Sequence, residues 1–243
     1  MESQDTSQNE VMFSSIPSFS QTSLDGPSFL NSQTNFFENA GILSRSAGEM
    51  IAEMTQVWID ERNAPEILPY EHSLVEPLIE AIESQTEKII EDMENNTTNS
   101  FESMVYQTEV ERIKYLLKSY LRVRLFKIEK LTLYILRQPN LREILSPQEI
   151  DYARRYQELV ESHNHKTFLH QLPRSQHKQD EVFVDMSMVV EPNLNAPVFC
   201  QILDNIGHVE IDGDNVLFEL RDIYILRYND IRSYLREKKV KLI

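Results

Sequence analysis

The stretch that most constrains the fold is a long helical segment at residues 110–137. Apolar side chains recur there every three or four residues, which places them on one side of an α-helix: Val110, Ile113, Leu117, Tyr120, Leu121, Ile128, Leu131 and Ile135. Other apolar residues lie at different angles around the same helix, so we expect it to be central and buried on more than one side. No Gly or Pro interrupts residues 101–137, a length that would span roughly 55 Å as a helix.

Positive charge is concentrated on this helix. Residues 109–137 contain eight Lys and Arg against three Glu, although the whole chain has a net charge of −15. Arg124 is unusual, because it lies in line with the apolar residues, where an unpaired charge would cost several kcal/mol. It therefore needs a carboxylate or carbonyl partner. An internal salt bridge and a contact with a partner protein are both open as explanations.

The preceding segment is acidic. Residues 49–94 hold thirteen acidic and two basic side chains, and their apolar residues follow helical spacing on both sides of Pro65 and Pro69. Ser46 and Glu49 have the spacing of a capping box at the start of the first helix. We expect two acidic helices that pack antiparallel to the basic helix and are partly neutralised by it, with a solvated acidic face as the alternative.

A further helix start is predicted at Ser146-Pro147-Gln148-Glu149, where serine, proline and glutamate are each favoured for separate reasons. This helix should end near Leu172. Beyond residue 180, short segments rich in Val, Ile and Phe are separated by turn residues, which predicts strands: 182–190, 198–203, 209–211, 216–220, 223–227 and 240–243. A hairpin is expected at Asp212-Gly213, and Asn229 should cap a short helix at residues 230–238.

The expected fold class is α+β, with an N-terminal helical bundle domain followed by a small β-rich C-terminal domain. We place a disordered Ser/Gln-rich tail at residues 1–47, the helical domain at 48–172, a linker at 173–191 and the β-rich domain at 192–243. The tail contains eleven serines and a lone cation, and its apolar residues follow no period.

Four serines of the tail precede glutamine, a dipeptide that resembles the target of DNA-damage checkpoint kinases. A tail of this composition also produces such pairs by chance. The possible phosphosites are Ser3, Ser7, Ser20 and Ser32.

Little in the sequence indicates catalysis or metal binding. The chain has five glycines and no phosphate-binding or nucleophile motif, so we expect no catalytic residue, no metal and no cofactor. The single cysteine, Cys200, fits a reducing compartment and a buried position. Four histidines between residues 163 and 177 lack the spacing of a metal site, which favours capping or solvated positions. Because the sequence shows neither a signal sequence nor a long apolar run, we expect that the protein is not secreted and does not span a membrane.

Three stretches of the chain resemble one known family, the Sld-five-type subunit of the GINS complex: WIDERNAPEILP at residues 58–69, ERIKYLLKSYLRVRLFKIEK at 111–130 and LSPQEIDYARRYQELVESH at 145–163. The resemblance covers residues 50–172 well and the C-terminal end more loosely. GINS is the four-subunit accessory assembly of the eukaryotic replicative helicase. In this subunit type the helical domain also precedes the β-rich domain.

The resemblance implies a nuclear, non-catalytic scaffold subunit of a heterotetramer that is required for initiation and elongation of DNA replication. It implies three other GINS subunits as partners, together with the MCM helicase ring, its RecJ-like partner and the leading-strand polymerase machinery. The positions that match the family are candidates for the subunit interface or the core: Trp58, Pro65, Arg112, Tyr120, Leu121, Arg122, Arg124, Lys127, Leu242 and Ile243. The last two belong to the C-terminal end, which in this family packs against a neighbouring subunit.

The alternative function is that of a helical nucleic-acid-binding protein that uses the basic helix 109–137. An isoelectric point near 4.8 argues against tight direct DNA binding, because nucleic-acid binders concentrate positive charge on an open surface. The resemblance and the lack of catalytic motifs favour a constitutive subunit of a larger assembly.

Overall fold

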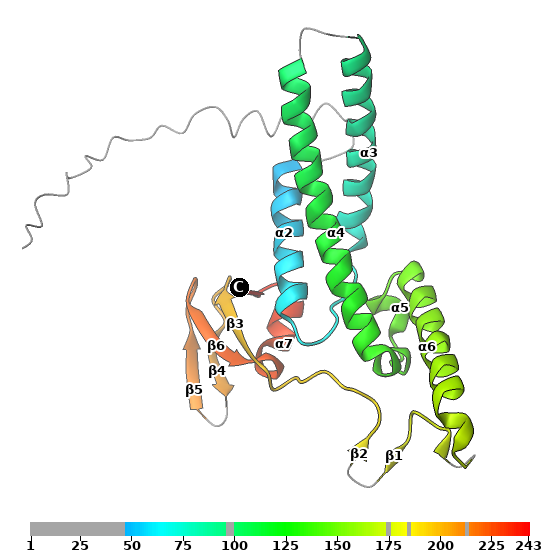
Figure 1. The fold of residues 1–243 in the computed structure, drawn as a ribbon. Coiled ribbons are helices and arrows are strands. Elements are labelled where there is room, and N and C mark those ends of the chain that lie inside the picture. Colours follow the sequence, from blue (N-terminus) through cyan, green and yellow to red (C-terminus); the bar gives the residue numbers. More distant parts are fainter. Residues whose placement is uncertain (1–46, 96–99, 174–175, 184–185, 212–213) are drawn as a thin grey trace, which may run out of the picture.

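A three-helix bundle forms the N-terminal part of the structure, a computed structural model that describes residues 47–95, 100–173, 176–183, 186–211 and 214–243. Its helices are α2 (Ala47–Asn63), α3 (His72–Asn95) and α4 (Ser100–Leu136). They are the helices expected from the apolar spacing. Helix α3 runs antiparallel to α4 as expected, whereas α2 runs parallel to it (Figure 1). The expected cap Ser46, the tail and the possible phosphosites lie outside the described residues.

The predicted apolar stripe of α4 makes the core of the bundle. Ile113 and Tyr120 are fully buried in one cluster with Met54 of α2 and Leu78 of α3. Each such side chain contributes about 1.5–3 kcal/mol by leaving water. The loop between α2 and α3 contains the two prolines that were expected to break the helix.

Helix α4 spans 37 residues but is interrupted by a kink near its C-terminal end. Leu131 leaves the helical region, with φ −115° and ψ 20°. The hydroxyl of Thr132 donates to the carbonyl oxygens of Ile128 and Glu129 at 2.6 and 3.1 Å, and such back-bonding is a known cause of helix bending. The lack of Gly and Pro therefore predicted the extent of this helix but not its kink at Leu131.

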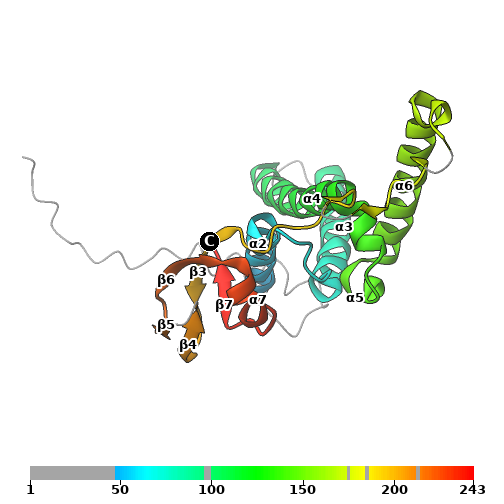
Figure 2. The same ribbon diagram turned by 90° about the horizontal axis from the view of Figure 1, so that it is seen from below.

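A second helical layer packs on the C-terminal half of α4. It consists of α5 (Leu141–Ile144) and α6 (Pro147–Thr167). Ala153 of α6 is fully buried in a cluster with Ile128 and Ile135 of α4. Seen from below, α6 and the β-rich part of the chain stand on opposite sides of the bundle (Figure 2).

The predicted capping box begins α6. Ser146 Oγ accepts a hydrogen bond from Glu149 N at 3.3 Å, and Glu149 Oε2 accepts one from Ser146 N at 3.0 Å. Pro147 occupies the first turn, as expected. The helix ends at Thr167, earlier than expected, and a 3-10 turn η1 (Leu169–Gln171) follows.

The C-terminal part of the chain forms a small antiparallel sheet beside the lower end of α2 (Figure 1). Its strand order is β6-β3-β7, with β3 (Pro197–Ile202) between β6 (Ile223–Arg227) and β7 (Val240–Leu242). β4 (Gly207–Ile211) and β5 (Asp214–Phe218) form a separate antiparallel ribbon. The strand predictions for this part are confirmed, while the expected turn residues of the ribbon lie outside the described residues.

The prediction of a single strand at 182–190 is wrong. This segment contains two short strands, β1 (Val182–Phe183) and β2 (Met186–Ser187), which pair with each other. Alternating apolar residues cannot distinguish one long strand from two short ones that fold back on each other.

The predicted cap and end of the last helix are also wrong. α7 (Tyr228–Arg236) has Arg227 at its N-cap position, so Asn229 lies inside the helix. The helix stops before residue 238 because Lys238 adopts a left-handed backbone conformation, with φ 58°. A left-handed residue after the last turn is a common way for a helix to end.

The capping box yields a stability prediction. Ser146→Ala should lower the free energy of unfolding by about 1 kcal/mol, because the amide of Glu149 loses its acceptor. Urea denaturation followed by circular dichroism measures the change. The matched control is Ser162→Ala, an exposed serine inside the same helix, which should change stability by less than about 0.5 kcal/mol. An equal effect of both substitutions would contradict the role of the cap.

Candidate functional site

The fully buried side chain of Arg124 lies at the centre of the helical domain. Its guanidinium binds both oxygens of Glu149 at 2.8 and 3.0 Å and Glu61 Oε2 at 3.0 Å. The backbone oxygens of Leu68 and Ile144 accept further hydrogen bonds at 2.7 and 2.9 Å. Each of the five N–H groups therefore has an acceptor. Of the two explanations offered for Arg124, the internal salt bridge is confirmed.

Aromatic rings and carboxylates keep Arg124 charged. Its guanidinium carbon lies 5.2 Å from the ring centre of Tyr70 and 5.6 Å from that of Tyr120, within the range of a cation–π interaction. Burial alone would lower the pKa of Arg124. The hydrogen bond to Glu149 and the charge of Glu61 outweigh burial, so the pKa is raised above its ordinary value.

Lys127 extends this charge cluster toward α2. Its ammonium donates to Glu61 Oε1 at 2.8 Å, to Glu66 O at 2.7 Å and to Glu61 O. Burial lowers the pKa of Lys127, and the negative charge of Glu61 opposes that shift. The charges of Arg124 and Lys127 are therefore paired inside the chain.

Most cations of the basic helix have partners within the chain. Arg112 and Lys114 each pair with a glutamate three residues earlier, at 2.7 and 3.0 Å, and Arg137 pairs with Asp180 at 3.0 Å. Within the described ranges, three cations of this helix have no ion pair: Lys118, Arg122 and Lys130. The basic helix thus neutralises the acidic segment in part, as expected, but it does so through the buried Glu61. Its surface pairs use Glu109, Glu111 and Asp180, which lie outside that segment.

Glu66 connects the charge cluster to the β-rich domain. Its carboxylate accepts hydrogen bonds from Tyr228 Oη at 2.8 Å and from Arg232 Nε at 2.6 Å, and it lies 3.7 Å from Arg236. Burial and the charge of Glu66 raise the pKa of Tyr228, so its hydroxyl remains a donor. Since the backbone oxygen of Glu66 also binds Lys127, one residue contacts both domains.

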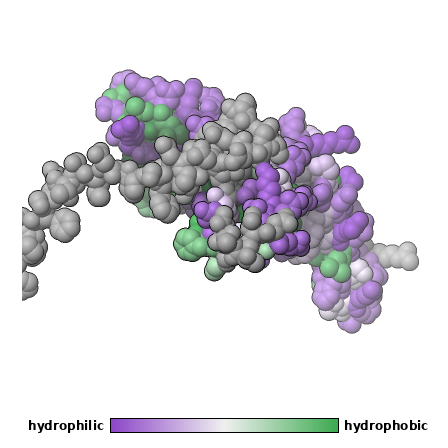
Figure 3. All heavy atoms as spheres, turned by 90° about the horizontal axis from the view of Figure 1, so that it is seen from above, coloured by the Kyte–Doolittle hydropathy of each residue, from purple (hydrophilic) through white to green (hydrophobic). Residues whose placement is uncertain are grey.

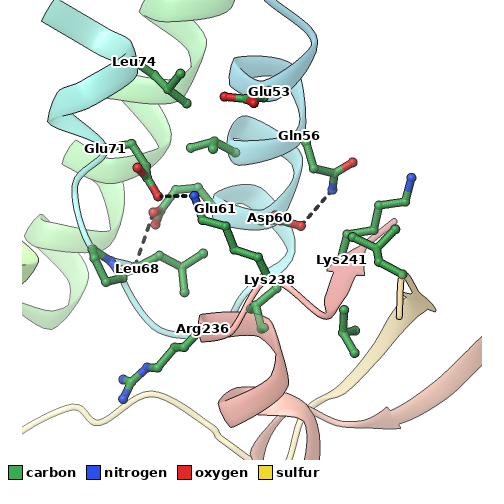
Figure 4. Close-up of a pocket in the computed structure, with 15 residues that line it drawn as sticks. Glu53, Gln56, Asp60, Glu61, Leu68, Glu71, Leu74, Arg236, Lys238 and Lys241 are labelled. Atoms are coloured by element: carbon green, nitrogen blue, oxygen red, sulfur yellow. Dashed lines mark hydrogen bonds and ion pairs between the residues drawn. The ribbon is translucent and has the colours of Figure 1, made fainter. Parts of the chain in front are cut away.

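A groove of about 530 Å³ opens between α2 and the C-terminal segment (Figure 4). Its wall on the α2 side carries the carboxylates of Asp60 and Glu71, and the opposite wall carries the ammonium groups of Lys238 and Lys241. Lys238 Nζ lies 3.6 Å from Glu71 Oε1. The opposite charges favour contact between the two walls, although an exposed pair of this kind contributes less than about 1 kcal/mol.

The C-terminal strand is bound to α2 of its own chain. Leu242 N donates to Asp60 Oδ1 at 2.8 Å, and Leu242 O accepts from Gln56 Nε2 at 3.0 Å. Ile243 O accepts from Asn63 Nδ2 at 2.7 Å. Burial raises the pKa of Asp60, and the hydrogen bond from Leu242 opposes that shift. Leu242 is buried, so of this terminal pair only Ile243 presents its side chain to the outside.

Exposed apolar side chains gather on α3 and α4. The described part of these helices exposes Ile79, Ile90, Met93, Phe101, Met104, Val105, Tyr106, Tyr115 and Phe126. Seen from above, hydrophobic colour appears at the free end of the bundle and on the β-rich domain (Figure 3). Phe101 is 78% exposed, and Tyr115 and Phe126 are each 64% exposed. Helical spacing puts Phe101, Met104, Val105, Tyr115 and Phe126 on one side of α4. Monomeric proteins rarely leave so many large apolar side chains uncovered, which makes this side the candidate site.

The predicted interface or core residues fall into three groups. Four are buried within the chain: Tyr120, Arg124, Lys127 and Leu242. Three are partly buried: Trp58, Pro65 and Leu121. Three are exposed: Arg112, Arg122 and Ile243. Trp58 packs against the bundle core, as expected of a core anchor.

Sequence reasoning missed Tyr115 and Phe126 as surface residues. They share a side of α4 with the exposed Arg122, at spacings of seven and four residues, and this side faces away from Arg124. The signal was present in the sequence. Phe126 was one of the apolar residues that predicted burial on more than one side of the helix, and no position was predicted for Tyr115.

Other expectations concern histidine and cysteine. His170 and His177 bind the backbone oxygens of His165 and Leu172 at 3.1 and 2.9 Å, which matches the capping role. Cys200 is fully buried, and burial raises the pKa of its thiol. Within the residues that the structure describes, no three His, Cys, Asp or Glu side chains are arranged to hold a metal ion. None of the described helices has both the length and the apolar character needed to cross a bilayer.

Removal of the central charge should strongly destabilise the chain. Arg124→Ala should lower the free energy of unfolding by about 3 kcal/mol or more, because Glu149 would remain buried without its cationic partner and Glu61 would lose one of its two. Arg122→Ala, two residues away on the exposed side, should change it by less than about 0.5 kcal/mol. Chemical denaturation compares the two variants. Equal stabilities would show that the buried ion pairs do not support the fold.

The contact between the domains can be tested separately. Glu66→Ala should release the β-rich domain, because Arg232 and Tyr228 lose their shared acceptor. Hydrogen exchange of α7 amides should become faster, while amides of α4 keep their protection. Glu71→Ala removes only the weak pair of this half-buried carboxylate with the exposed Lys238 and should leave exchange in α7 unchanged. Unchanged exchange in both variants would mean that Glu66 does not hold the domains together.

Comparison with known proteins gives a family for this architecture. Residues 81–168 match a family model described as "GINS complex protein helical bundle domain", and residues 192–243 match "DNA replication complex GINS protein SLD5 C-terminus". The chain is 35% identical over 188 residues to the DNA replication complex GINS protein sld5 of Schizosaccharomyces pombe, covering 76% of this chain and 88% of the relative.

Relatives in plants and animals are also similar. The protein named GINS protein SLD5 in Arabidopsis thaliana is 32% identical over 197 residues, covering 78% of this chain and 89% of the relative. The SLD5 protein of Mus musculus is 29% identical over 207 residues, covering 80% and 89%. Both the helical and the β-rich parts are thus shared with one family. The chain belongs to the Sld5 family of GINS proteins.

Proposed function

We propose that this chain is the Sld5-type subunit of a heterotetrameric GINS complex and acts in DNA replication as a scaffold without catalytic chemistry. The observation that carries the proposal is the exposed apolar surface of α3 and α4 on a chain whose relatives are named GINS proteins. The polar groups inside the chain are paired, whereas apolar side chains remain exposed outside. This combination is typical of a subunit whose exposed apolar surface is buried by partner subunits.

The proposed contact surface follows the exposed side of α4. Tyr115 and Phe126 lie about 16 Å apart along the helix, and aromatic residues of this kind often supply most of the binding energy of an interface. Arg122 lies between them and has no ion pair in the described chain, so it is available to a carboxylate of a partner. Arg112 and the half-exposed Ile243 are further proposed contacts.

The wider assembly follows from the same proposal. Its partners are three other GINS subunits, the MCM helicase ring with its RecJ-like partner, and the leading-strand polymerase machinery, and its location is the nucleus. Family membership supports these assignments.

Phosphorylation of Ser3, Ser7, Ser20 or Ser32 after DNA damage is a separate hypothesis. Phosphopeptide mapping that finds none of them modified would remove it.

Direct nucleic-acid binding by the basic helix is less well supported. Arg124 and Lys127 are buried, and three further cations of the helix pair with carboxylates of the same chain. Fewer cations are therefore available to phosphate than the sequence implies.

The proposal predicts a defined complex. Co-expression with the three candidate GINS partners, followed by size-exclusion chromatography with light scattering, should give one peak with a 1:1:1:1 mass. A chain that elutes alone as a monomer in the presence of all three partners would contradict the proposal.

The interface can be tested in the same experiment. Tyr115→Glu combined with Phe126→Glu should remove the chain from the complex, because two carboxylates would be buried without partners. The free energy of unfolding of the isolated variant should lie within about 0.5 kcal/mol of that of the parent chain, since both side chains are exposed. Leu220→Glu, on a residue that is 55% exposed in the β-rich domain, is the matched control and should assemble normally. Assembly of the double variant would place the interface elsewhere.

A further inference from the structure

Strand β6 presents its backbone at the open edge of the β-rich sheet. The strand order puts β7 beside α2 and β6 at the opposite edge (Figure 2). Tyr228 N, which follows β6 directly, donates to Ala196 O at 3.0 Å. Alternate residues of an antiparallel strand bond to the same neighbour, so Tyr224 also bonds to β3. Ile223 and Ile225 therefore direct their N–H and C=O groups away from the sheet.

This edge has none of the usual protection in its middle. Among the described residues, none forms a hydrogen bond with the outward backbone groups of Ile223 and Ile225. Natural edge strands are commonly blocked by a charged side chain, a proline or a bulge. Residues 223–225 are Ile-Tyr-Ile, and β6 pairs with β3 over five consecutive residue pairs without a bulge. Such an edge is a template for a further strand.

We propose that two copies of this chain pair through β6, antiparallel about a twofold axis at Tyr224. This register sets Ile223 opposite Ile225 of the other copy, and the same pair recurs on the far side of the axis. Each pair exchanges two hydrogen bonds, so both N–H and both C=O groups of each edge obtain partners. A second copy is the occupant because the spacing of the outward residues makes the edge complementary to itself.

The side chains of the edge are compatible with this pairing. Ile223 and Ile225 are 59% and 61% exposed, and Phe199, which pairs with Ile225 inside the sheet, is 55% exposed. Pairing of two edges would place these apolar side chains of both copies in one continuous row, with no charge directly opposite another among residues 223–225.

The contact is weak by its size and by the charge of the chain. Pairing over three residues buries less than the roughly 1,000 Å² of a stable dimer, and each copy has a net charge of −15, which repels the other at low salt. The dimer should therefore form at high protein concentration and high salt. It would be strengthened wherever another contact already holds two copies close together.

Hydrogen exchange measured by NMR on the full chain tests the pairing amide by amide. In dilute solution the amides of Ile223 and Ile225 should exchange fast and that of Tyr224 slowly, because only Tyr224 bonds to β3. At a concentration at which nine tenths of the chains are dimeric, exchange at the two isoleucines should be about tenfold slower, since it proceeds from the remaining monomer. Exchange rates there that do not depend on concentration would overturn the proposal.

Variants at one position separate the edge from the fold. Ile225→Pro removes an outward amide and no amide that bonds to β3, so analytical ultracentrifugation should find a monomer where the parent chain is dimeric. Ile225→Lys keeps the amide but adds the charge that blocks natural edges, and it should also be monomeric. Ile225→Val is the matched control and should dimerise like the parent. Amide shifts of α4 report folding, and a dimer in Ile225→Lys would overturn the proposal.

Self-association through the exposed side of α4 is the competing explanation of a dimer. Tyr115→Glu combined with Phe126→Glu alters that side and leaves β6 intact, so this variant should still dimerise and still show slower exchange at Ile223. Loss of the dimer in this variant would assign the contact to α4 and overturn the proposal. The inference does not depend on the proposed function, because the same variant should fail to join the complex while its β6 edges still pair.

Discussion

The rest of the structure depends on the buried guanidinium of Arg124, because each of its five N–H groups needs a hydrogen-bond acceptor. Arg124 obtains them from α2, from the loop before α3, from α5 and from α6. These segments must therefore take their places around α4 together, because each missing acceptor would leave a buried donor unsatisfied. Apolar layers fill the space between the helices. The ion pairs select the arrangement of those layers in which every N–H group of the buried guanidinium has a partner.

The same network extends beyond the helical domain. Glu61 links Arg124 to Lys127, Lys127 binds the backbone of Glu66, and Glu66 binds α7 through its side chain. Each step is a direct contact of buried or partly buried groups. The β-rich domain is thus held in part by charges that begin at the centre of the bundle, and in part by the hydrogen bonds of α2 with the C-terminal strand. The acidic segment 49–94 is neutralised from two directions, by Arg124 and Lys127 of α4 and by Arg232 and Lys238 of the C-terminal segment.

Local signals predicted much of this fold. The capping box at Ser146, the breaks at the two prolines and the stripe of α4 depend on residues close in sequence, so their spacing was informative. Arg124 was recognised as needing a partner, but Glu61 and Glu149 lie 63 and 25 residues away, a separation at which spacing carries no information. The docking of Leu242 on α2 and the exposed side of α4 with Tyr115 and Phe126 were missed for a related reason. Whether an apolar residue is buried depends on which helices and strands from distant parts of the sequence pack against it.

Lys238 illustrates a conflict between backbone preference and side-chain reach. Its left-handed conformation is one that glycine adopts freely and other residues adopt at a cost of about 1 kcal/mol. Glycine would therefore suit the turn between α7 and β7. The lysine, however, extends across the groove to Glu71, which glycine could not do. A chain with glycine here would form the turn more readily but would lose this weak contact across the groove, so the sequence keeps a side chain at a position whose backbone conformation favours glycine.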